Sequence, residues 1–331
     1  MTAGLRVVTL LTALLTALPA AAQPAGKKLP RVALIFSTTP VAEMQGPDPV
    51  APDARVFVHA LRDRGWLDGQ TVVIERRSAE AKWDRVPALF ADVVRQEPDV
   101  LVTTSLRMVR AARDATTTIP IVMYMSDPVG RGLAATLARP GGNVTGLDID
   151  VTPDLVAKRV QLLKETIPGL ARLAVLSGSA SPPRLQQAQA LIKPLGIALV
   201  PLDAESDAKL EGALQTMARD RPDAVMVDDI ASFYDWRGRI VEFVSRQRLP
   251  TLGPWREFAE SGAVMAYGYN TFDLLRQQAG YVDRILRGAK PADLPIERPS
   301  RFDFVVNRKT ARALGITLPP SILAQATELI D

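Results

Sequence analysis

Cysteine is absent from the 331 residues of this chain, and histidine occurs once, as His59. Zinc sites built from Cys and His, thiol nucleophiles and cysteine-pair racemases are therefore excluded. A Ser-His-Asp triad would have to use His59, which lies in the helical pattern VFVHALRDRG and is interpreted as a packed or surface side chain. The phosphate-binding patterns GxGxxG and GxxxxGKS/T and the nucleophile elbow GxSxG are missing as well. We predict no cofactor and no metal, and catalysis by carboxylates alone is the one enzymatic alternative left open.

Charge of one sign is not in excess, because 40 Lys and Arg face 36 Asp and Glu for a formal net charge of +4. Removal of residues 1–22, whose single charge is Arg6, lowers this value to +3 (+4 − 1). The basic residues are interspersed with acids instead of clustered, so nucleic acid is not predicted as a partner.

The N-terminus has the pattern of a secretory signal. A basic residue precedes an apolar stretch from Val7 to Leu18, and Ala20 and Ala22 have the spacing that signal peptidase recognises. This stretch is too short to span about 30 Å of hydrocarbon as a helix. We predict a signal peptide over residues 1–22 and a mature chain that begins near Gln23. Without cysteine there is no lipid anchor, so we expect a freely diffusing protein retained in the periplasm of a Gram-negative cell.

Beyond residue 30, short apolar runs alternate with segments of helical period, which is typical of βαβ units on a parallel sheet. The predicted strands are RVALIF (31–36), TVVIE (71–75), DVLVT (99–103), IPIVMYM (119–125), RLAVLS (172–177), IALVPL (197–202), DAVMV (223–227) and LPTLG (249–253). The predicted helices include segments 53–65, 85–97, 155–167 and 184–196, and a further helix that starts after Asp127 in PVGRGLAATLA (128–138).

The two halves of the chain repeat the same order of elements. RVALIFST (31–38) is echoed by RLAVLSGS (172–179), PDVLVTTS (98–105) by PDAVMVDD (222–229), IPIVMYMSD (119–127) by LPTLGPWRE (249–257), and GGNVTGLDID (141–150) by SGAVMAYGYN (261–270). We therefore predict an α/β fold of two Rossmann-like lobes with parallel sheets, joined by a multi-crossover hinge. Lobe 1 would comprise residues 30–146 plus about 271–295, and lobe 2 residues 147–270 plus about 296–331.

In open parallel sheets, ligands bind outside the carboxyl ends of the strands, so two lobes would enclose a cleft that closes on a solute. Polar and aromatic side chains follow the predicted strands at these ends. The candidate ligand-binding residues are Ser37, Thr38, Thr104, Ser105, Asp127, Asp228, Trp255 and Tyr267.

Each candidate also has a purely structural interpretation. Asp127 before a proline is a typical helix N-cap, and a cap leaves acceptor capacity for a ligand. Ser105 would cap a helix whose N–H groups attract an anion, although Arg107 in that first turn opposes the helix dipole and is interpreted as solvated. Of the adjacent acids Asp228 and Asp229, at most one is expected to face the cleft. Aromatic side chains at strand ends are more often packing residues than ligand platforms.

Several stretches resemble one known family. They are TTTIPIV (116–122), DPVG (127–130), LARPGGNVTG (137–146) and the closing TARALGITLPPSIL (310–323). From about Arg31 to Ile330 the chain is similar to the ABC transporter substrate-binding proteins of the group that includes the tryptophan- and tyrosine-binding proteins.

This resemblance implies a type I periplasmic-binding fold without enzymatic activity. It also implies capture of a small polar solute, an amino acid or related carboxylate, and delivery to an inner-membrane permease of an ABC transporter. A monomer is expected. Leu106, Arg107 and Met108 depart from the small residues common in the family, which leaves the identity of the solute open. A periplasmic ligand sensor for a receptor kinase and, less favoured, a carboxylate-based enzyme are the alternatives.

Overall fold

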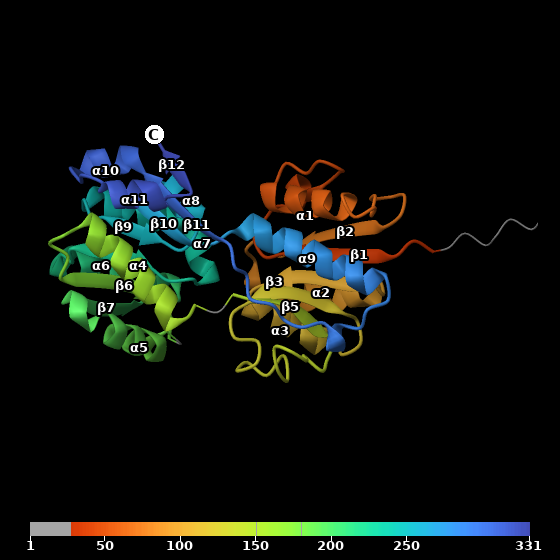
Figure 1. Cartoon of the computed structure of the whole chain (residues 1–331). Helices are drawn as coiled ribbons and strands as arrows, with labels where there is room; N and C mark the ends of the chain where they lie inside the picture. The colour runs from red at the N-terminus through yellow and green to blue at the C-terminus, as the bar shows by residue number, and fades with distance from the viewer. Residues whose placement is uncertain (1–27, 150, 180) are drawn as a thin grey trace, which may run out of the picture.

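The structure is a computed structural model that describes residues 28–149, 151–179 and 181–331 (Figure 1). The predicted signal peptide over residues 1–22 and the predicted mature start near Gln23 lie outside the described residues. Within the described ranges, no helix is long and apolar enough to cross a membrane.

The first sheet has five parallel strands in the order β2-β1-β3-β4-β5. Its strands are β1 (Arg31–Phe36), β2 (Val73–Ser78), β3 (Val100–Thr104), β4 (Ile121–Met125) and β5 (Val144–Asp148). Its helices are α1 (Pro52–Arg62), α2 (Val86–Arg95), α3 (Leu106–Ala115) and α9 (Thr271–Leu286). We call this sheet with its four helices lobe 1.

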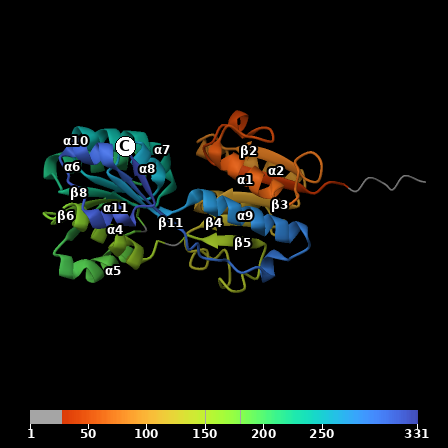
Figure 2. The same cartoon turned by 45° about the horizontal axis from the view of Figure 1, so that its top comes forward.

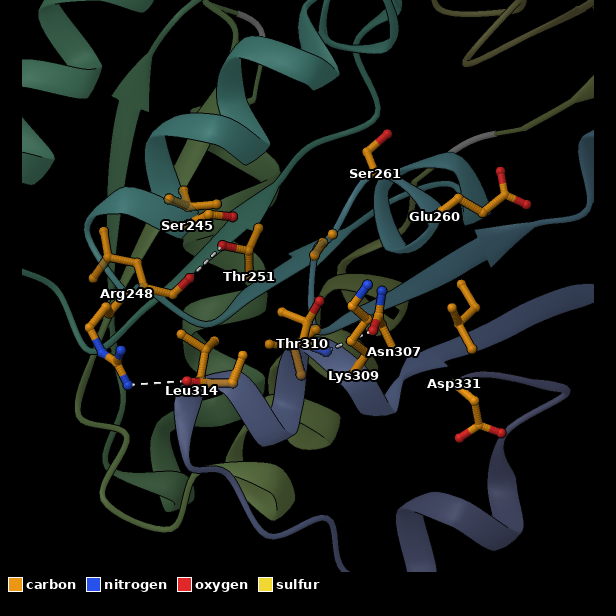
Figure 3. A pocket seen from close by; sticks show the side chains of 17 residues that line it. Ser245, Arg248, Thr251, Glu260, Ser261, Asn307, Lys309, Thr310, Leu314 and Asp331 are labelled. Atoms are coloured by element: carbon orange, nitrogen blue, oxygen red, sulfur yellow. Dashed lines mark hydrogen bonds between the residues drawn. The ribbon is translucent and has the colours of Figure 1, made fainter.

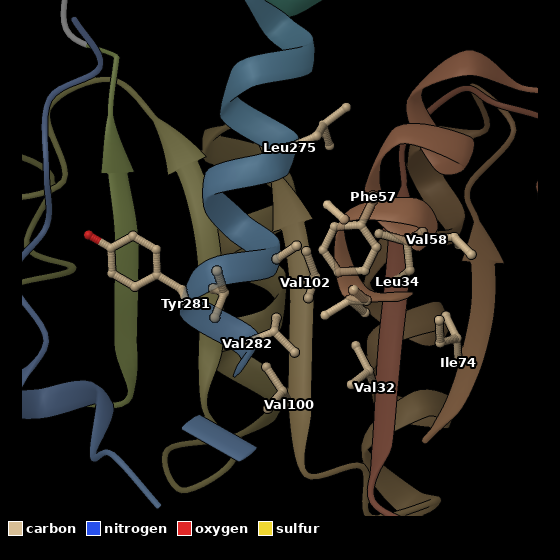
Figure 4. Close-up of a cluster of buried hydrophobic side chains, with 14 of the residues drawn as sticks. Val32, Leu34, Phe57, Val58, Ile74, Val100, Val102, Leu275, Tyr281 and Val282 are labelled. Carbon is tan, nitrogen blue, oxygen red and sulfur yellow. The ribbon is translucent and has the colours of Figure 1, made fainter. Parts of the chain in front are cut away.

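Apolar side chains alternate between the two faces of the lobe 1 strands, and each face has its own core. Val32 and Leu34 point to the face covered by α1 and α9, where they meet Phe57 and Val282 (Figure 4). The other face, which includes Ile35, packs against α2 and α3. Helix α9 is distant in sequence from the rest of lobe 1, so burial of its apolar face fixes the return of the chain to this lobe.

The second sheet has seven strands in the order β12-β11-β10-β9-β8-β6-β7. Its strands are β6 (Arg172–Ser177), β7 (Ala198–Asp203), β8 (Ala224–Val227), β9 (Thr251–Gly253), β10 (Met265–Tyr269), β11 (Phe302–Asn307) and β12 (Glu328–Ile330). Its helices are α4 (Pro153–Thr166), α5 (Pro182–Ile192), α6 (Asp207–Asp220), α7 (Ala231–Arg246), α8 (Arg256–Glu260), α10 (Arg308–Leu314) and α11 (Pro320–Gln325). We call this sheet with its helices lobe 2.

The repeat seen in the sequence corresponds to a repeat in topology. The order β7-β6-β8-β9-β10 of lobe 2 reproduces the order β2-β1-β3-β4-β5 of lobe 1, which confirms the predicted fold class. Four strands were not among those predicted from the sequence. They are β5, β10, β11, which pairs antiparallel with β10, and β12, which pairs parallel with β11.

The chain passes between the lobes at three places (Figures 1 and 2). The first follows β5, the second is Asn270 between β10 and α9, and the third is residues 298–301 before β11. Asn270 is held on both sides, because its Nδ2 donates to the Asp303 carboxylate at 2.9 Å and its Oδ1 accepts from Asp273 N at 2.6 Å. The predicted lobe boundaries at residues 147, 271 and 296 stay predictions.

The prediction of a helix after Asp127 was wrong. Residues 126–143 form turns, in which Asp127 Oδ1 accepts from Gly130 N at 2.9 Å and Pro128 O from Leu133 N at 2.9 Å. Gly132 has φ +72°, outside the helical region. Two glycines in one turn each weaken a helix by about 1 kcal/mol, so an Asx-type turn replaces the helix. Leu133 still packs into the core beside α3.

Gly146 lets β5 approach β4 closely. Its φ is +134°, and a Cβ there would lie 2.0 Å from Met123 O. We expect Gly146→Ala to lower the free energy of unfolding by roughly 3 kcal/mol, because backbone strain and a steric clash add. Urea unfolding measures the change. Gly142→Ala is the matched control, since a Cβ at Gly142 meets nothing within 4 Å, and a similar loss there would contradict the explanation.

Candidate functional site

The cleft edge of lobe 1 contains strained backbone. Four non-glycine residues with positive φ follow the carboxyl ends of β2, β3 and β4: Glu80 (+49°), Ala81 (+61°), Ser105 (+67°) and Asp127 (+55°). Ser105, with ψ 151°, occupies a region that is essentially restricted to glycine. Strain of this kind costs about 1–3 kcal/mol and clusters at ligand-binding sites.

Three side-chain oxygens at the facing strand ends are buried and lack a hydrogen-bond partner among the described residues. They are Ser105 Oγ after β3, Ser232 Oγ in the first turn of α7 after β8, and Glu257 Oε2 in α8 after β9. An unsatisfied buried polar group costs about 1–3 kcal/mol. Because the three atoms come from both lobes and from strand ends, they point to a common site that a polar ligand would complete.

Polar and charged groups of the two lobes lie close enough across the cleft to influence each other. Thr38 of lobe 1 lies near the Asp235 carboxyl of α7, and the charge of Arg237 of α7 acts on Asp53 of α1. The negative charge of Glu257 also acts on the hydroxyl group of Tyr124 in β4. The structure is therefore a closed arrangement, in which the side chains of α7 and α8 face α1 and the ends of β3 and β4.

Aromatic side chains form one wall of this cleft. The rings of Tyr234 and Trp255 meet edge to face, with centroids 5.7 Å apart, and Trp255 also contacts the buried Phe258. The Arg237 guanidinium lies 4.5 Å from the centroid of the Tyr234 ring, and its NH1 donates to Tyr234 O at 2.6 Å. This arrangement offers aromatic surface beside a cation.

Burial raises the pKa values of the acids in the cleft. It raises the pKa of Glu257 to about 7, and the nearby Asp53 charge adds to the rise. Burial also raises the pKa of Asp53, although Arg237 opposes this. The phenols of Tyr124 and Tyr234 have pKa values raised by the same cause, so both are neutral donors at physiological pH.

Four of the residues predicted from the sequence belong to the strand ends that carry this cluster. Thr38 lies near Asp235, Thr104 lies near the Tyr124 hydroxyl, and Trp255 packs on Tyr234. The fourth is Ser105, whose Oγ is buried without a partner among the described residues. Their role in ligand binding stays a prediction.

Asp228 and Asp229 are bound within lobe 2. Asp228 is 3% exposed and accepts from Ser181 Oγ at 2.6 Å and from Arg184. Asp229 pairs with the fully buried Arg159, which also donates to Tyr267 O at 2.8 Å. Both carboxylates therefore already have cationic partners, and Asp228 supports the cleft wall from behind.

The other predicted residues have structural contacts of their own. The Tyr267 ring stacks on Phe302 with centroids 5.6 Å apart. Asp127 is exposed and caps its own turn, while Ser37 O accepts from Ala81 N at 2.9 Å. Arg107 lies over the Trp83 ring at 5.2 Å and donates to Trp83 O at 3.0 Å, which offsets its unfavourable place in a helix first turn.

Six residues of the cluster were not predicted from the sequence: Asp53, Tyr124, Tyr234, Asp235, Arg237 and Glu257. Most of them lie within helices, where the sequence pattern of a polar binding residue is the same as that of an ordinary solvent-exposed residue. Tyr124 was in a predicted strand, and its place one residue before the strand end was the available signal. Among the described residues, no three His, Asp or Glu side chains gather closely enough to hold a metal ion.

A separate pocket of about 500 Å³ lies within lobe 2, at the amino ends of β9 and β10 and the carboxyl ends of β11 and β12 (Figure 3). Arg248, Thr251 and Asn307 line it, and each makes a hydrogen bond inside lobe 2. None of the buried unpartnered side-chain atoms among the described residues belongs to this pocket, so the cleft is the stronger candidate site.

Glu257 gives the folded protein a specific pH dependence. Its folded pKa of about 7 exceeds the ordinary value of 4.5, so the folded state binds more protons between these values. The stabilisation is present at low pH and is lost as pH rises through 7. Relative to Glu257→Gln, the wild type should lose about 2 kcal/mol of unfolding free energy between pH 5 and pH 8. Urea titrations at both pH values measure this. Glu242→Gln, at an exposed acid of α7 that pairs with Arg246, should follow the wild type; a parallel pH profile for Glu257→Gln would contradict the pKa shift.

Comparison with known proteins agrees with this geometry. The family model described as ABC transporter substrate binding protein matches residues 52–330. The Tyrosine-binding protein of Clostridioides difficile (strain R20291) is 23% identical over 265 residues, which cover 78% of this chain and 75% of that relative.

Solved structures have the same fold. A conserved domain protein from Vibrio cholerae O1 biovar El Tor is 26% identical with a TM-score of 0.79, and the match covers 91% of this chain and 100% of that one. The ABC domain in complex with L-Trp from Streptococcus pneumonia is 23% identical with a TM-score of 0.80, covering 92% and 100%. The predicted resemblance is thus confirmed, and the chain belongs to the ABC transporter substrate-binding protein family, whose members are extracytoplasmic solute-binding proteins and not enzymes.

Proposed function

We propose that this protein captures a small polar solute between its lobes and delivers it to an inner-membrane permease of an ABC importer. The observation that carries the proposal is the set of unpartnered buried atoms, Ser105 Oγ, Ser232 Oγ and Glu257 Oε2, at facing strand ends. A bound solute would satisfy these atoms, and their desolvation cost would then be recovered on binding.

Capture would proceed by hinge closure. The chain crosses between the lobes at three short segments, and such segments absorb the dihedral changes of closure. Contacts between Thr38 and Asp235, and between Asp53 and Arg237, exist only when the lobes are together. A solute that bridges the lobes favours the closed state by its differential affinity, and this state would be presented to the permease.

The chemistry of the cleft suits an amino acid or a related carboxylate. Tyr234 and Trp255 offer an aromatic surface, and the ten-residue helix α3 directs its first N–H groups toward the site beside Ser105. The names of relatives, one a tyrosine-binding protein and one in complex with L-Trp, support this class.

We further propose a periplasmic, unlipidated monomer produced by cleavage of residues 1–22.

Identification of a co-purified solute tests the proposal directly. Protein isolated from periplasm should show an additional mass in native mass spectrometry, and denaturation should release a small molecule of unchanged composition. Release of nothing, together with no binding in a thermal-shift screen of amino acids and carboxylates, would contradict solute capture. A ligand at 100 times its dissociation constant adds about 2.7 kcal/mol to the folded state, which such a screen detects.

The unpartnered hydroxyls give a sharper mutational test. Ser105→Gly and Ser232→Ala should weaken binding of the released solute roughly tenfold, because each removes one buried hydrogen bond. Neither should lower the stability of the empty protein, and Ser105→Gly should raise it by about 1 kcal/mol by relieving strain. Calorimetry and urea unfolding measure the two effects.

Ser181→Ala is the matched control. Ser181 Oγ donates to the buried Asp228 at 2.6 Å, so its loss should reduce stability by roughly 1–3 kcal/mol and leave affinity nearly unchanged. Unchanged affinity in both Ser105→Gly and Ser232→Ala would place the solute elsewhere.

A further inference from the structure

Two carboxylates from different lobes lie within electrostatic reach of each other in the closed cleft. Asp53 lies in the first turn of α1 in lobe 1, and Glu257 in the first turn of α8 in lobe 2. No ion pair joins either of them to another described residue, whereas Asp228 and Asp229 both have arginine partners. Like charges this close oppose closure unless something lies between them.

The buried unpartnered hydroxyls are an independent sign that a ligand belongs here. Ser105 Oγ reaches the cleft from lobe 1 and Ser232 Oγ from lobe 2, both without solvent contact. Hydroxyl groups both donate and accept, so they fit several ligand groups. The charge of the ligand is therefore decided by the carboxylates.

The cation already present does not neutralise these acids. Arg237 faces Asp53, Asp235 and Glu257, which is one positive charge against three carboxyl groups. Its guanidinium is also engaged, because it stacks on the Tyr234 ring and donates to Tyr234 O at 2.6 Å. The cleft thus retains an excess of negative charge that a positively charged group would complement.

We propose that Asp53 and Glu257 together bind a protonated amine of the solute, so that the cleft selects amine-bearing solutes over the corresponding acids. This inference rests on the proposed function. An ammonium group between the two carboxylates turns repulsion across the cleft into a bridge, and charge-assisted hydrogen bonds of this kind are stronger than neutral ones. The Trp255 ring adds a cation–π surface.

Binding of the amine is coupled to release of a proton. In the empty closed cleft, Glu257 holds its proton up to a pKa of about 7, because burial disfavours the charged form. An ammonium group favours the ionised carboxylate and displaces that proton. The titratable and charged groups that face Glu257 are Asp53 of α1, Tyr124 of β4, Tyr234 and Arg237 of α7, and Glu260 of α8.

Matched probes test the selectivity. Calorimetry compares L-tyrosine with 3-(4-hydroxyphenyl)propionate, which lacks only the amine, and L-tryptophan with indole-3-propionate. The amine-bearing member should bind at least tenfold more tightly. Its affinity should fall about tenfold from pH 8 to pH 6, as the ionised fraction of Glu257 falls. Asp53→Asn and Glu257→Gln should each weaken the amine at least tenfold, and Glu257→Gln should abolish the pH dependence. Glu242→Gln, at an exposed acid of α7 that pairs with Arg246, is the control and should behave as the wild type.

The outcomes separate this inference from the proposed function. Equal affinity for both members of a pair, or full amine affinity in both carboxamide variants, overturns the inference while solute capture stands. If no probe binds, the solute released from purified protein decides. A released solute without an amine nitrogen overturns the inference, and an amine that co-purifies with the wild type but not with Glu257→Gln supports it. Absence of both probe binding and a released solute overturns the proposed function and this inference with it.

Discussion

The buried side chain of Arg159 joins the strand ends that form the cleft wall of lobe 2. It pairs with Asp229 after β8 and donates to Tyr267 O in β10, while Gly268 lets β10 lie against Pro254, because a Cβ there would lie 1.9 Å from Pro254 O. A buried guanidinium must have its partners, because an uncompensated charge costs several kcal/mol. The ends of β8 and β10 are therefore fixed relative to each other, with β9 between them. Helix α7, which follows β8, and helix α8, which follows β9, bring Arg237 and Glu257 to the cleft.

The cleft edge of lobe 2 contains, among the described residues, both polar groups that have hydrogen-bond partners and polar groups that have none. Asp228 and Asp229 are satisfied within lobe 2, so they define geometry, whereas Ser232 Oγ and Glu257 Oε2 have no partner among the described residues. The partnered carboxylates of Asp228 and Asp229 are compatible with a stable folded state, whereas burial of Ser232 Oγ and Glu257 Oε2 without partners destabilises it. A ligand-binding role explains why groups that oppose folding are retained, and the strained backbone of Ser105 on the facing lobe follows the same logic.

The sequence was sufficient for the fold because the relevant signals are local and repeated. Apolar runs predicted the strands, and the recurrence of RVALIFST as RLAVLSGS anticipated the common strand order of the two sheets. The antiparallel β11 and the turns after Asp127 were missed. Strand β11 forms by pairing with β10 after the chain has returned to lobe 2, and this pairing has no local sequence signal. The turns after Asp127 form because Gly130 and Gly132 disfavour a helix more than the N-cap at Asp127 favours it.

The site was less predictable because it depends on which carboxylates lack partners, and partners are distant in sequence. Asp228 and Asp229 are adjacent, yet their arginines lie 44 and 70 residues away on different helices. Asp53 follows Pro52 and reads as a first-turn acid that favours the helix dipole. Only closure of the two lobes brings Asp53 near Glu257, and a carboxylate that serves a helix when the cleft is open becomes a costly charge when it is closed. This change in environment is what a cationic ligand group can exploit, since its binding then stabilises the closed state more than the open one.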